Sequence, residues 1–271
     1  MGQRGDLVVG IGAMRSGTTT LHNYLDSHPD VRVTRHKEAH YFDLNYDNGP
    51  EWYDEQFEPG PALWRADVTP SYMSETQACE RIAAEASRVV VILRDPITRA
   101  FSHYLQKRSY GTEPLSFTAA LDAEPARIRD LEEGRWLYGY LDRGNYLEYL
   151  TPYAEALGRD AIHVMILDDL MAEPDATWNG LCNFLAISPV APSRHKPSNP
   201  YVEFRSQRLR TLTRRLPRPA ARIVGRLNSR RRPPPAMDPR DVARLREHFG
   251  PGVDALSVWL DRDLRALWWG R

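Results

Sequence analysis

The segment from residue 7 to residue 21, LVVGIGAMRSGTTTL, contains the residue types that bind phosphate. An apolar stretch runs directly into a turn rich in Gly, Ser and Thr, and this turn opens a predicted helix. In such a turn, successive backbone N–H groups and the helix N-terminus converge on one anion, and Gly12 and Gly17 let the backbone approach it closely. The segment therefore predicts a phosphate-binding loop between a strand and a helix.

The spacing from Gly12 to Gly17 matches the P-loop pattern G-x-x-x-x-G-K-[ST], with one departure. Thr18 stands where that pattern has lysine, and a cation comes earlier, at Arg15. A nucleoside triphosphatase needs the lysine for the β and γ phosphates and the next hydroxyl for magnesium. The loop therefore favours a metal-free anion, such as a nucleotide 5′-phosphate that carries a transferable group. The structural alternative is a tight turn that needs glycine for backbone reasons alone.

A second segment, VVVILRDPITRAFSHY at 89–104, predicts a buried parallel strand and then a helix that begins at Pro96. Arg94 falls at the carboxyl end of this strand, where open α/β sheets bind their ligands, so Arg94 and Arg15 are expected to face one crevice. Ser102, about two helical turns later, adds a hydroxyl donor to the same anion. The alternative is an arginine that pairs with a surface carboxylate.

Together, RSGTTTL and RDPITRAFSHY resemble the two cofactor motifs of the sulfotransferases that use 3′-phosphoadenosine 5′-phosphosulfate. The resemblance implies that Arg94 and Ser102 hold the 3′-phosphate, and that Arg15 bridges the 5′-phosphate and the sulfuryl group. Arginine stays protonated, so Arg15 would steady the leaving phosphate without giving it a proton. The resemblance also implies that the 5′-phosphate is held by the backbone of Ser16, Gly17, Thr18 and Thr19.

A third cofactor element is suggested by HKPSNPYVEFR at 195–205, which resembles a short and variable motif of the same family. There, Lys196 and Asn199 would close over the nucleotide. The alternative is an ordinary loop that contains proline. Relatives of this kind need no metal for the transfer.

The segments HKEAHYFDLNYDNGPEWY and DVTPSYM, within residues 36–73, resemble heparan sulfate 3-O-sulfotransferases and related bacterial carbohydrate sulfotransferases. The resemblance implies that Glu38 is the general base and that His40 and Asp43 line the acceptor cleft. A carboxylate beside the reacting oxygen can take the proton of a hydroxyl that attacks sulfur. The alternative is a surface glutamate paired with Lys37. Val68 stands where the glucosaminyl enzymes have a lysine, which argues against a highly anionic acceptor.

The same segment places His36 and His40 four residues apart, as in the zinc motif H-E-x-x-H. The glutamate lies in the middle of HKEAH instead of directly after the first histidine, and the sequence offers no third ligand. We therefore expect no metal site.

These features predict a sulfotransferase. An acceptor hydroxyl of a sugar, a glycolipid or a natural product attacks sulfur in line, with Glu38 as base and Arg15 stabilising the leaving phosphate. One alternative is a P-loop kinase of nucleotides or small molecules, which the missing lysine and the missing magnesium carboxylate motif disfavour. Another is an inactive nucleotide-binding scaffold.

The fold expected for this chain is α/β, a P-loop-like three-layer fold with a central parallel sheet flanked by helices. Periodicity predicts strands at 7–13, 89–93 and 161–167, and helices at 18–27, 75–86, 96–108, 144–156 and 174–185. Irregular helices are expected between 110 and 143, and terminal helices at 238–270. We expect a single sulfotransferase domain over residues 1–271.

Residues 205–232 contain eleven arginines and no acidic residue, although the whole chain has a formal net charge of zero. We expect a basic insertion or lid at about 205–235. It would cover the nucleotide, contact an anionic membrane or an acidic ligand, or form a solvated helix with a loop. Nucleic acid is not an expected partner, because the rest of the chain is acidic and no recognition fold is evident.

The composition, 42% hydrophobic and 27% charged over 271 residues, is that of a globular protein. The sequence has no apolar run of membrane-spanning length, and its N-terminal apolar stretch is needed as the first strand. We therefore expect a cytoplasmic enzyme with a small-molecule or glycan acceptor. The oligomeric state stays open.

Overall fold

The computed structural model describes residues 5–191, 202–204, 224, 229–231 and 234–270. The described chain divides into two compact units: residues 1–96, 145–196 and 251–271 belong to the first, and residues 97–144 and 197–250 to the second. The prediction of a single domain remains a prediction.

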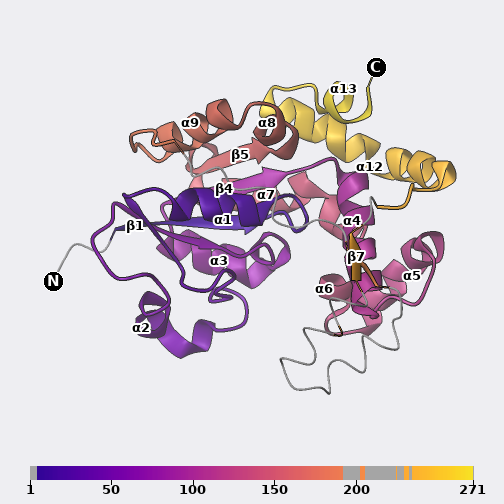
Figure 1. The fold of residues 1–271 in the computed structure, drawn as a ribbon, viewed down its shortest axis with the longest axis horizontal. Coiled ribbons are helices and arrows are strands. Elements are labelled where there is room, and N and C mark those ends of the chain that lie inside the picture. Colours follow the sequence, from indigo (N-terminus) through magenta and orange to yellow (C-terminus); the bar gives the residue numbers. More distant parts are fainter. Residues whose placement is uncertain (1–4, 192–201, 205–223, 225–228, 232–233, 271) are drawn as a thin grey trace. The chain divides into compact units, whose positions relative to one another are not determined.

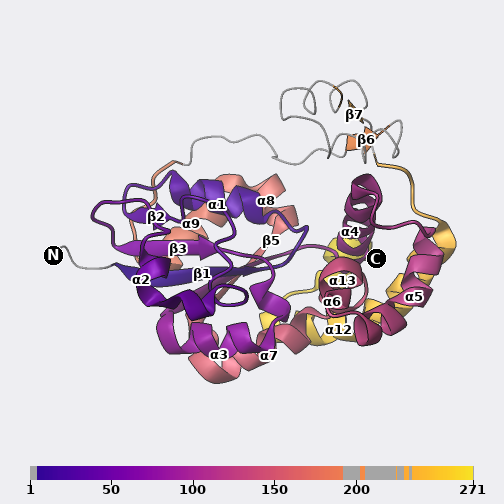
Figure 2. The ribbon, with the colours of Figure 1, turned by 90° about the horizontal axis from the view of Figure 1, so that it is seen from below.

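The first unit is built on a parallel sheet with the strand order β2-β3-β1-β4-β5. Figure 1 labels β1, β4 and β5 of this sheet, and Figure 2 labels β2 and β3. Within the described residues, its strands are β1 Asp6–Gly12, β2 Val31–Val33, β3 Trp64–Val68, β4 Arg88–Leu93 and β5 Ile162–Ile166. The parallel sheet expected from the sequence is confirmed, and the three predicted strands lie within one residue of β1, β4 and β5. Strands β2 and β3 were missed.

Helices cover both faces of this sheet. Figure 2 shows α1, α8 and α9 on one face and α3 and α7 on the other. The bounds are α1 Thr18–Asp26, α2 Gly49–Asp54, α3 Thr76–Glu85, α7 Tyr146–Leu157, α8 Leu167–Ala172, α9 Pro174–Phe184 and α13 Leu264–Trp269. Short 3-10 turns lie at η1 Tyr46–Asn48, η2 Tyr72–Ser74 and η4 Arg159–Ala161. The three layers confirm the predicted fold class.

The core under α1 and α9 shows why these segments fold as they do. Leu21 and Leu25 of α1, one helical turn apart, pack with Val90 and Ile92 of β4 and with Trp178 of α9. The strands are buried on both faces, as expected for a parallel sheet between helical layers. Burial of these side chains holds the strand ends, and hence the loops that follow them, in fixed positions.

The second unit is mainly helical. It contains α5 Phe117–Asp130, α6 Gly134–Tyr138 and η3 Asp142–Gly144. It also contains α4 Pro96–Tyr110, except for Pro96 itself, and the first half of α12 Pro239–Leu260. The expectation of irregular helices at 110–143 was partly wrong, because α5 is a regular helix. The Ser116 side chain starts it by accepting the N–H of Ala119 (3.3 Å).

The Arg-rich segment lies largely outside the described residues. From its C-terminal part, β7 Ser229–Arg231 pairs antiparallel with β6 Val202–Phe204. The proposed lid at about 205–235 therefore stays a prediction. None of the described helices is long and apolar enough to cross a membrane.

The contact between Gly144 and Phe249 gives a test of packing in the second unit. A Cβ placed on Gly144 would lie 2.4 Å from Cε1 of the Phe249 ring. We expect Gly144→Ala to destabilise the protein by about 1 to 3 kcal/mol, because the ring must shift within a packed core. Urea unfolding measures this. The matched control is Gly252→Ala in α12, whose Cβ would meet nothing within 4 Å. It should leave stability equal or higher, since alanine favours helix; equal losses for both variants would contradict the packing argument.

Candidate functional site

The candidate site is built from segments that follow the carboxyl ends of four neighbouring strands. The loop 13–17 follows β1, residues 34–43 follow β2, the turn at Thr69 follows β3, and Arg94 follows β4. In a parallel sheet all these ends lie at one edge, where open α/β proteins bind ligands. Thr69 also donates its backbone N–H to the carbonyl of Gly10 (2.9 Å), which ties the turn after β3 to β1.

The loop between β1 and α1 has the properties of an anion site. Gly17 has φ 101°, in the left-handed region, and a Cβ there would lie 3.0 Å from Leu167 Cδ1. Ser16 is fully buried, and among the described residues its Oγ has no hydrogen-bond partner. A buried hydroxyl without a partner is costly, so it fits a ligand that supplies one. The first-turn amides of α1 add positive potential at the same point.

Arg94 meets this loop as the sequence predicted. Its Nη1 donates to the carbonyl oxygen of Arg15 (3.4 Å), and Tyr146 donates its hydroxyl proton to the carbonyl of Arg94 (2.8 Å). The indole of Trp269 donates to the neighbouring Asp95 (3.0 Å). Arg94 therefore lies at the loop that carries Arg15, while Tyr146 of α7 holds the Arg94 backbone and Trp269 of α13 holds the Asp95 side chain. No local sequence pattern pointed to Tyr146 or Trp269.

The remaining residues predicted for the cofactor are placed as follows. Thr18 and Thr19 lie in the first turn of α1. Ser102 lies within α4, in the second unit. Lys196 and Asn199 lie outside the described residues. The roles of these residues stay predictions.

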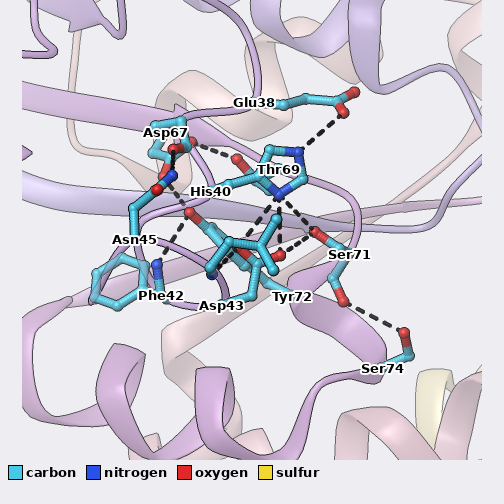
Figure 3. Close-up of polar contacts among 12 residues, drawn as sticks. Glu38, His40, Phe42, Asp43, Asn45, Asp67, Thr69, Ser71, Tyr72 and Ser74 are labelled. Carbon is cyan, nitrogen blue, oxygen red and sulfur yellow. Dashed lines mark hydrogen bonds and ion pairs between the residues drawn. The ribbon is translucent and has the colours of Figure 1, made fainter. Parts of the chain in front are cut away.

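Glu38, His40 and Asp43 form one chain of polar contacts. His40 Nε2 lies 3.7 Å from Glu38 Oε2, and His40 Nδ1 lies 3.0 Å from Asp43 Oδ2. Ser71 donates its hydroxyl proton to the same Asp43 oxygen (2.5 Å). Figure 3 shows the imidazole between Glu38 on one side and Asp43 with Ser71 on the other. The sequence predicted the first three residues and missed Ser71, although it lies in the DVTPSYM motif.

The contacts shift the pKa values of the chain in opposite directions. Burial alone would raise the pKa of Glu38, but the hydrogen bond to His40 and the charge of Lys37, whose Nζ lies 2.6 Å from Oε1, lower it to about 2. The hydrogen bonds to Asp43 and then Glu38 raise the pKa of His40 to about 9, against the effect of burial. At neutral pH, Glu38 is therefore ionised and His40 is an imidazolium.

The backbone at these residues is strained. Arg15, Glu38 and His40 have φ values of 73°, 68° and 53°, in the left-handed region that residues with a Cβ rarely adopt. Such strain persists only when the surroundings enforce it, and it gathers at ligand sites. The loop after β1 and the loop after β2 both carry such strain, as do Ala186 and Asp261 elsewhere among the described residues.

The buried carboxyl group of Asp67, near the end of β3, supports the turn after β3 and the loop after β2. It accepts hydrogen bonds from the hydroxyls of Tyr53 (3.2 Å), Thr69 (2.8 Å) and Tyr72 (2.8 Å). Tyr72 in turn accepts the backbone N–H of Phe42 (3.3 Å) through its hydroxyl oxygen, as Figure 3 shows. The segment that carries His40 and Asp43 is thus anchored to the sheet.

Two further predictions concern the acceptor and metal. Val68 is fully buried at the end of β3, beside Gly10 of β1, so an apolar side chain stands at the position of the lysine in the glucosaminyl enzymes. Among the described residues, no group of three or more His, Cys, Asp and Glu side chains has the arrangement of a metal site.

Comparison with known proteins decides the family. The sequence profile of the family described as "Sulfotransferase domain" matches residues 6–204. The chain belongs to this sulfotransferase family. Its β1 loop, Glu38 segment and Arg94 all fall within the matched region.

The sulfotransferase is also similar to named proteins. It is 28% identical over 191 residues to heparan sulfate glucosamine 3-O-sulfotransferase 3B1 of Mus musculus, over 68% of this chain and 47% of that protein. It is 27% identical to the Homo sapiens 3B1 enzyme, over 89% of this chain and 60% of that protein. The chain spans about half the length of the first of these curated relatives. A sulfotransferase from Alicyclobacillus acidocaldarius shares its fold, with a TM-score of 0.72, 23% identity, and coverage of 97% and 98% of the two chains.

The raised pKa of His40 makes a prediction about stability. A raised folded-state pKa contributes stability that is present below about pH 6.5 and lost as the pH rises through about 9. The lowered pKa of Glu38 contributes stability that is present above about pH 4.5 and lost as the pH falls towards about 2. Asp43→Asn should lower the pKa of His40, because Asp43 is the largest cause of its rise.

The measurement is an imidazole NMR titration, together with urea unfolding at about pH 6 and about pH 10. Asp47→Asn, at an exposed position of the same loop, is the control and should leave the His40 titration in place. An unchanged His40 titration in Asp43→Asn would contradict the assignment.

Proposed function

We propose that this sulfotransferase transfers a sulfuryl group from 3′-phosphoadenosine 5′-phosphosulfate to an acceptor hydroxyl. The observation that carries the proposal is that an anion loop and an ionised carboxylate both follow the carboxyl ends of strands in one parallel sheet. The loop follows β1, contains the buried Ser16 hydroxyl and lies beside Arg94. The carboxylate is Glu38, which follows β2, and β3 lies between β2 and β1.

The residues of the loop suit the phosphate groups of such a donor. Arg15, Ser16 and the backbone from Gly17 to Thr19 would bind the 5′-phosphosulfate, and Arg94 would bind the 3′-phosphate with Ser102. When bound, the donor supplies the transferable sulfuryl group and an adenosine bisphosphate leaving group. The planar guanidinium of Arg15 stays charged and can steady negative charge as it develops. In the same proposal, Lys196 and Asn199 close over the nucleotide of the donor.

Glu38 would accept the proton of the acceptor hydroxyl. A carboxylate with a pKa of about 2 is a weak base toward a free alcohol. The hydroxyl becomes far more acidic as its oxygen bonds to sulfur, so proton transfer follows bond formation and a weak, ionised base suffices. The Lys37 ammonium holds one Glu38 oxygen, Oε1, and must give way to the acceptor.

His40 would act as a positioning residue. Its imidazolium donates toward Glu38 Oε2 with one nitrogen and toward Asp43 with the other, which fixes the orientation of the carboxylate. Asp43 would therefore act on Glu38 through His40. The Glu38 carboxylate has Lys37 at one oxygen and His40 at the other. These two cations explain why it stays ionised in a half-buried position.

The proposed acceptor is a hydroxyl group of a sugar, a glycolipid or a natural product. Val68 lies in the hydrophobic core, so it offers no cation to an acceptor with dense negative charge. A cytoplasmic location, and contact of residues 205–232 with an anionic membrane or an acidic ligand, are part of the proposal.

A first test replaces the base. Glu38→Gln keeps the shape of the side chain but cannot accept the proton, so turnover should fall by about two to four orders of magnitude with donor affinity nearly unchanged. The measurement is transfer of labelled sulfate to a panel of hydroxylated acceptors. Glu55→Gln, an exposed glutamate beyond α2, is the control. Near-normal turnover in Glu38→Gln would sink the role of this residue.

A second test examines the donor. The protein should bind adenosine 3′,5′-bisphosphate much more tightly than 5′-AMP, because contacts between arginine and phosphate are strong. Arg94→Ala should remove about 2 to 4 kcal/mol of that preference, measured by calorimetry. Arg88→Ala, at the opposite end of β4, should keep it. Equal affinity for both nucleotides, or stabilisation by ATP with magnesium alone, would reject the proposal in favour of a different nucleotide.

A further inference from the structure

Helix α4 carries a row of buried cationic or ionisable side chains on one face. Arg99, His103 and Lys107 follow at intervals of four residues, so they lie one above another on the helix. Their exposed fractions are 0%, 0% and 6%. Side chains of this kind are rarely buried without a partner, so their surroundings indicate what each one requires.

The first two have partners within the second unit. Arg99 donates a hydrogen bond to the carbonyl oxygen of Tyr140, and its charge also acts on the buried carboxyl of Glu124. His103 packs edge-on against the ring of Tyr140, with 4.9 Å between ring centroids. Both side chains are thus engaged by residues of their own unit.

The carboxylates nearby are engaged elsewhere. Glu113 binds Arg127 through both oxygens (2.6 and 3.2 Å) and accepts the hydroxyl of Tyr140 (2.8 Å). Glu124 accepts the backbone N–H groups at the start of η3, from Leu141 (2.8 Å) and from the next residue. Burial raises the pKa of Glu124 to about 7, so this group is only about half ionised at neutral pH.

Within the described residues, the Lys107 ammonium has neither a hydrogen bond nor an ion pair, and the Thr112 hydroxyl donates to the backbone carbonyl of Lys107 instead. The Nζ atom lies 5.6 Å from the centroid of the Trp136 ring. Arg143 lies against the same ring, 5.1 Å from its centroid. Burial, followed by the charge of Arg143, lowers the pKa of Lys107 to about 8, and Glu133 opposes this only from beyond ion-pair distance.

A buried ammonium beside a second cation is electrostatically unfavourable, and an aromatic face compensates only part of the lost hydration. An oxyanion would fill the donors of the ammonium and would also be attracted by the neighbouring guanidinium. We propose that Lys107, with Arg143 and Trp136, forms a binding site for an oxyanion in the second unit. The site takes a sulfate, phosphate or carboxylate group, and the ring of Trp136 provides a flat apolar wall beside it. The proposal is independent of the sulfuryl transfer.

The chain suits a direct test, because it has three lysines, at positions 37, 107 and 196. Side-chain NMR of the lysine Cε and Nζ groups in the full-length protein therefore gives three signals, which Lys→Met variants assign. Sodium sulfate is titrated against sodium chloride at equal ionic strength. We expect a saturable shift of the Lys107 signal and a rise in its pKa by about one unit or more, because an opposite charge close to an ammonium favours the protonated form.

Variants of Lys107 distinguish an anion-binding lysine from a lysine that only supports the fold. Lys107→Met should weaken sulfate binding at least about tenfold, the loss expected for one charge-assisted contact, and Lys107→Arg should retain binding. Arg129→Gln removes an exposed charge from the same unit and should change nothing.

Two outcomes would overturn the proposal. One is a Lys107 signal that responds equally to sulfate and chloride. The other is a Lys107 signal that responds to adenosine 3′,5′-bisphosphate and not to sulfate, which would assign the charge to a nucleotide site. The wild-type titration gives this answer even if Lys107→Met fails to fold.

Discussion

The buried carboxylate of Asp67 is the constraint on which the loops of the candidate site depend. A buried carboxyl group is costly unless its oxygens accept hydrogen bonds, and burial raises the pKa of Asp67. Here three hydroxyls donate to its two oxygens, from Tyr53 of α2, Thr69 after β3 and Tyr72 of η2. Satisfying one side chain therefore fixes three segments of the chain against the sheet. Because Tyr72 also binds the Phe42 backbone, the loop that presents His40 is fixed with them.

A second level of order comes from charge. Glu38, His40 and Asp43 alternate in sign, so each group holds its neighbour in the ionised form at neutral pH. The same contacts that orient Glu38 weaken it as a base. This trade-off suits the proposed transfer, in which the acceptor proton becomes acidic as the alcohol oxygen bonds to sulfur. Strained backbone at Glu38 and His40 is consistent with a position selected for chemistry instead of stability.

Local patterns explain which parts could be predicted from the sequence. The apolar run before Arg94 and the glycine spacing before α1 are contained in short segments, so strand, loop and helix were located within one or two residues. Strand β3 was missed because Asp67 interrupts the apolar pattern of the strand. Tyr53, one of the residues that make the burial of Asp67 acceptable, lies fourteen positions away. The contact of Trp269 with Asp95 spans 174 positions and leaves no local signal. Tertiary partners, which short patterns do not contain, account for these failures.

The choice between lysine and arginine adds a last constraint. Three of the 36 Lys and Arg residues are lysines, and two of these, Lys37 and Lys107, lie in the described residues. Arginine holds a carboxylate through a rigid fork and stays charged, whereas lysine offers a compact charge on a flexible stem. At Glu38, a single ammonium leaves the second oxygen to His40 and can move aside, which a bidentate guanidinium would resist. At position 107, burial beside Arg143 brings the pKa of the ammonium close to neutrality, a response that a guanidinium would not give. The two described lysines therefore stand where the contact or the pKa of the cation can respond to its surroundings.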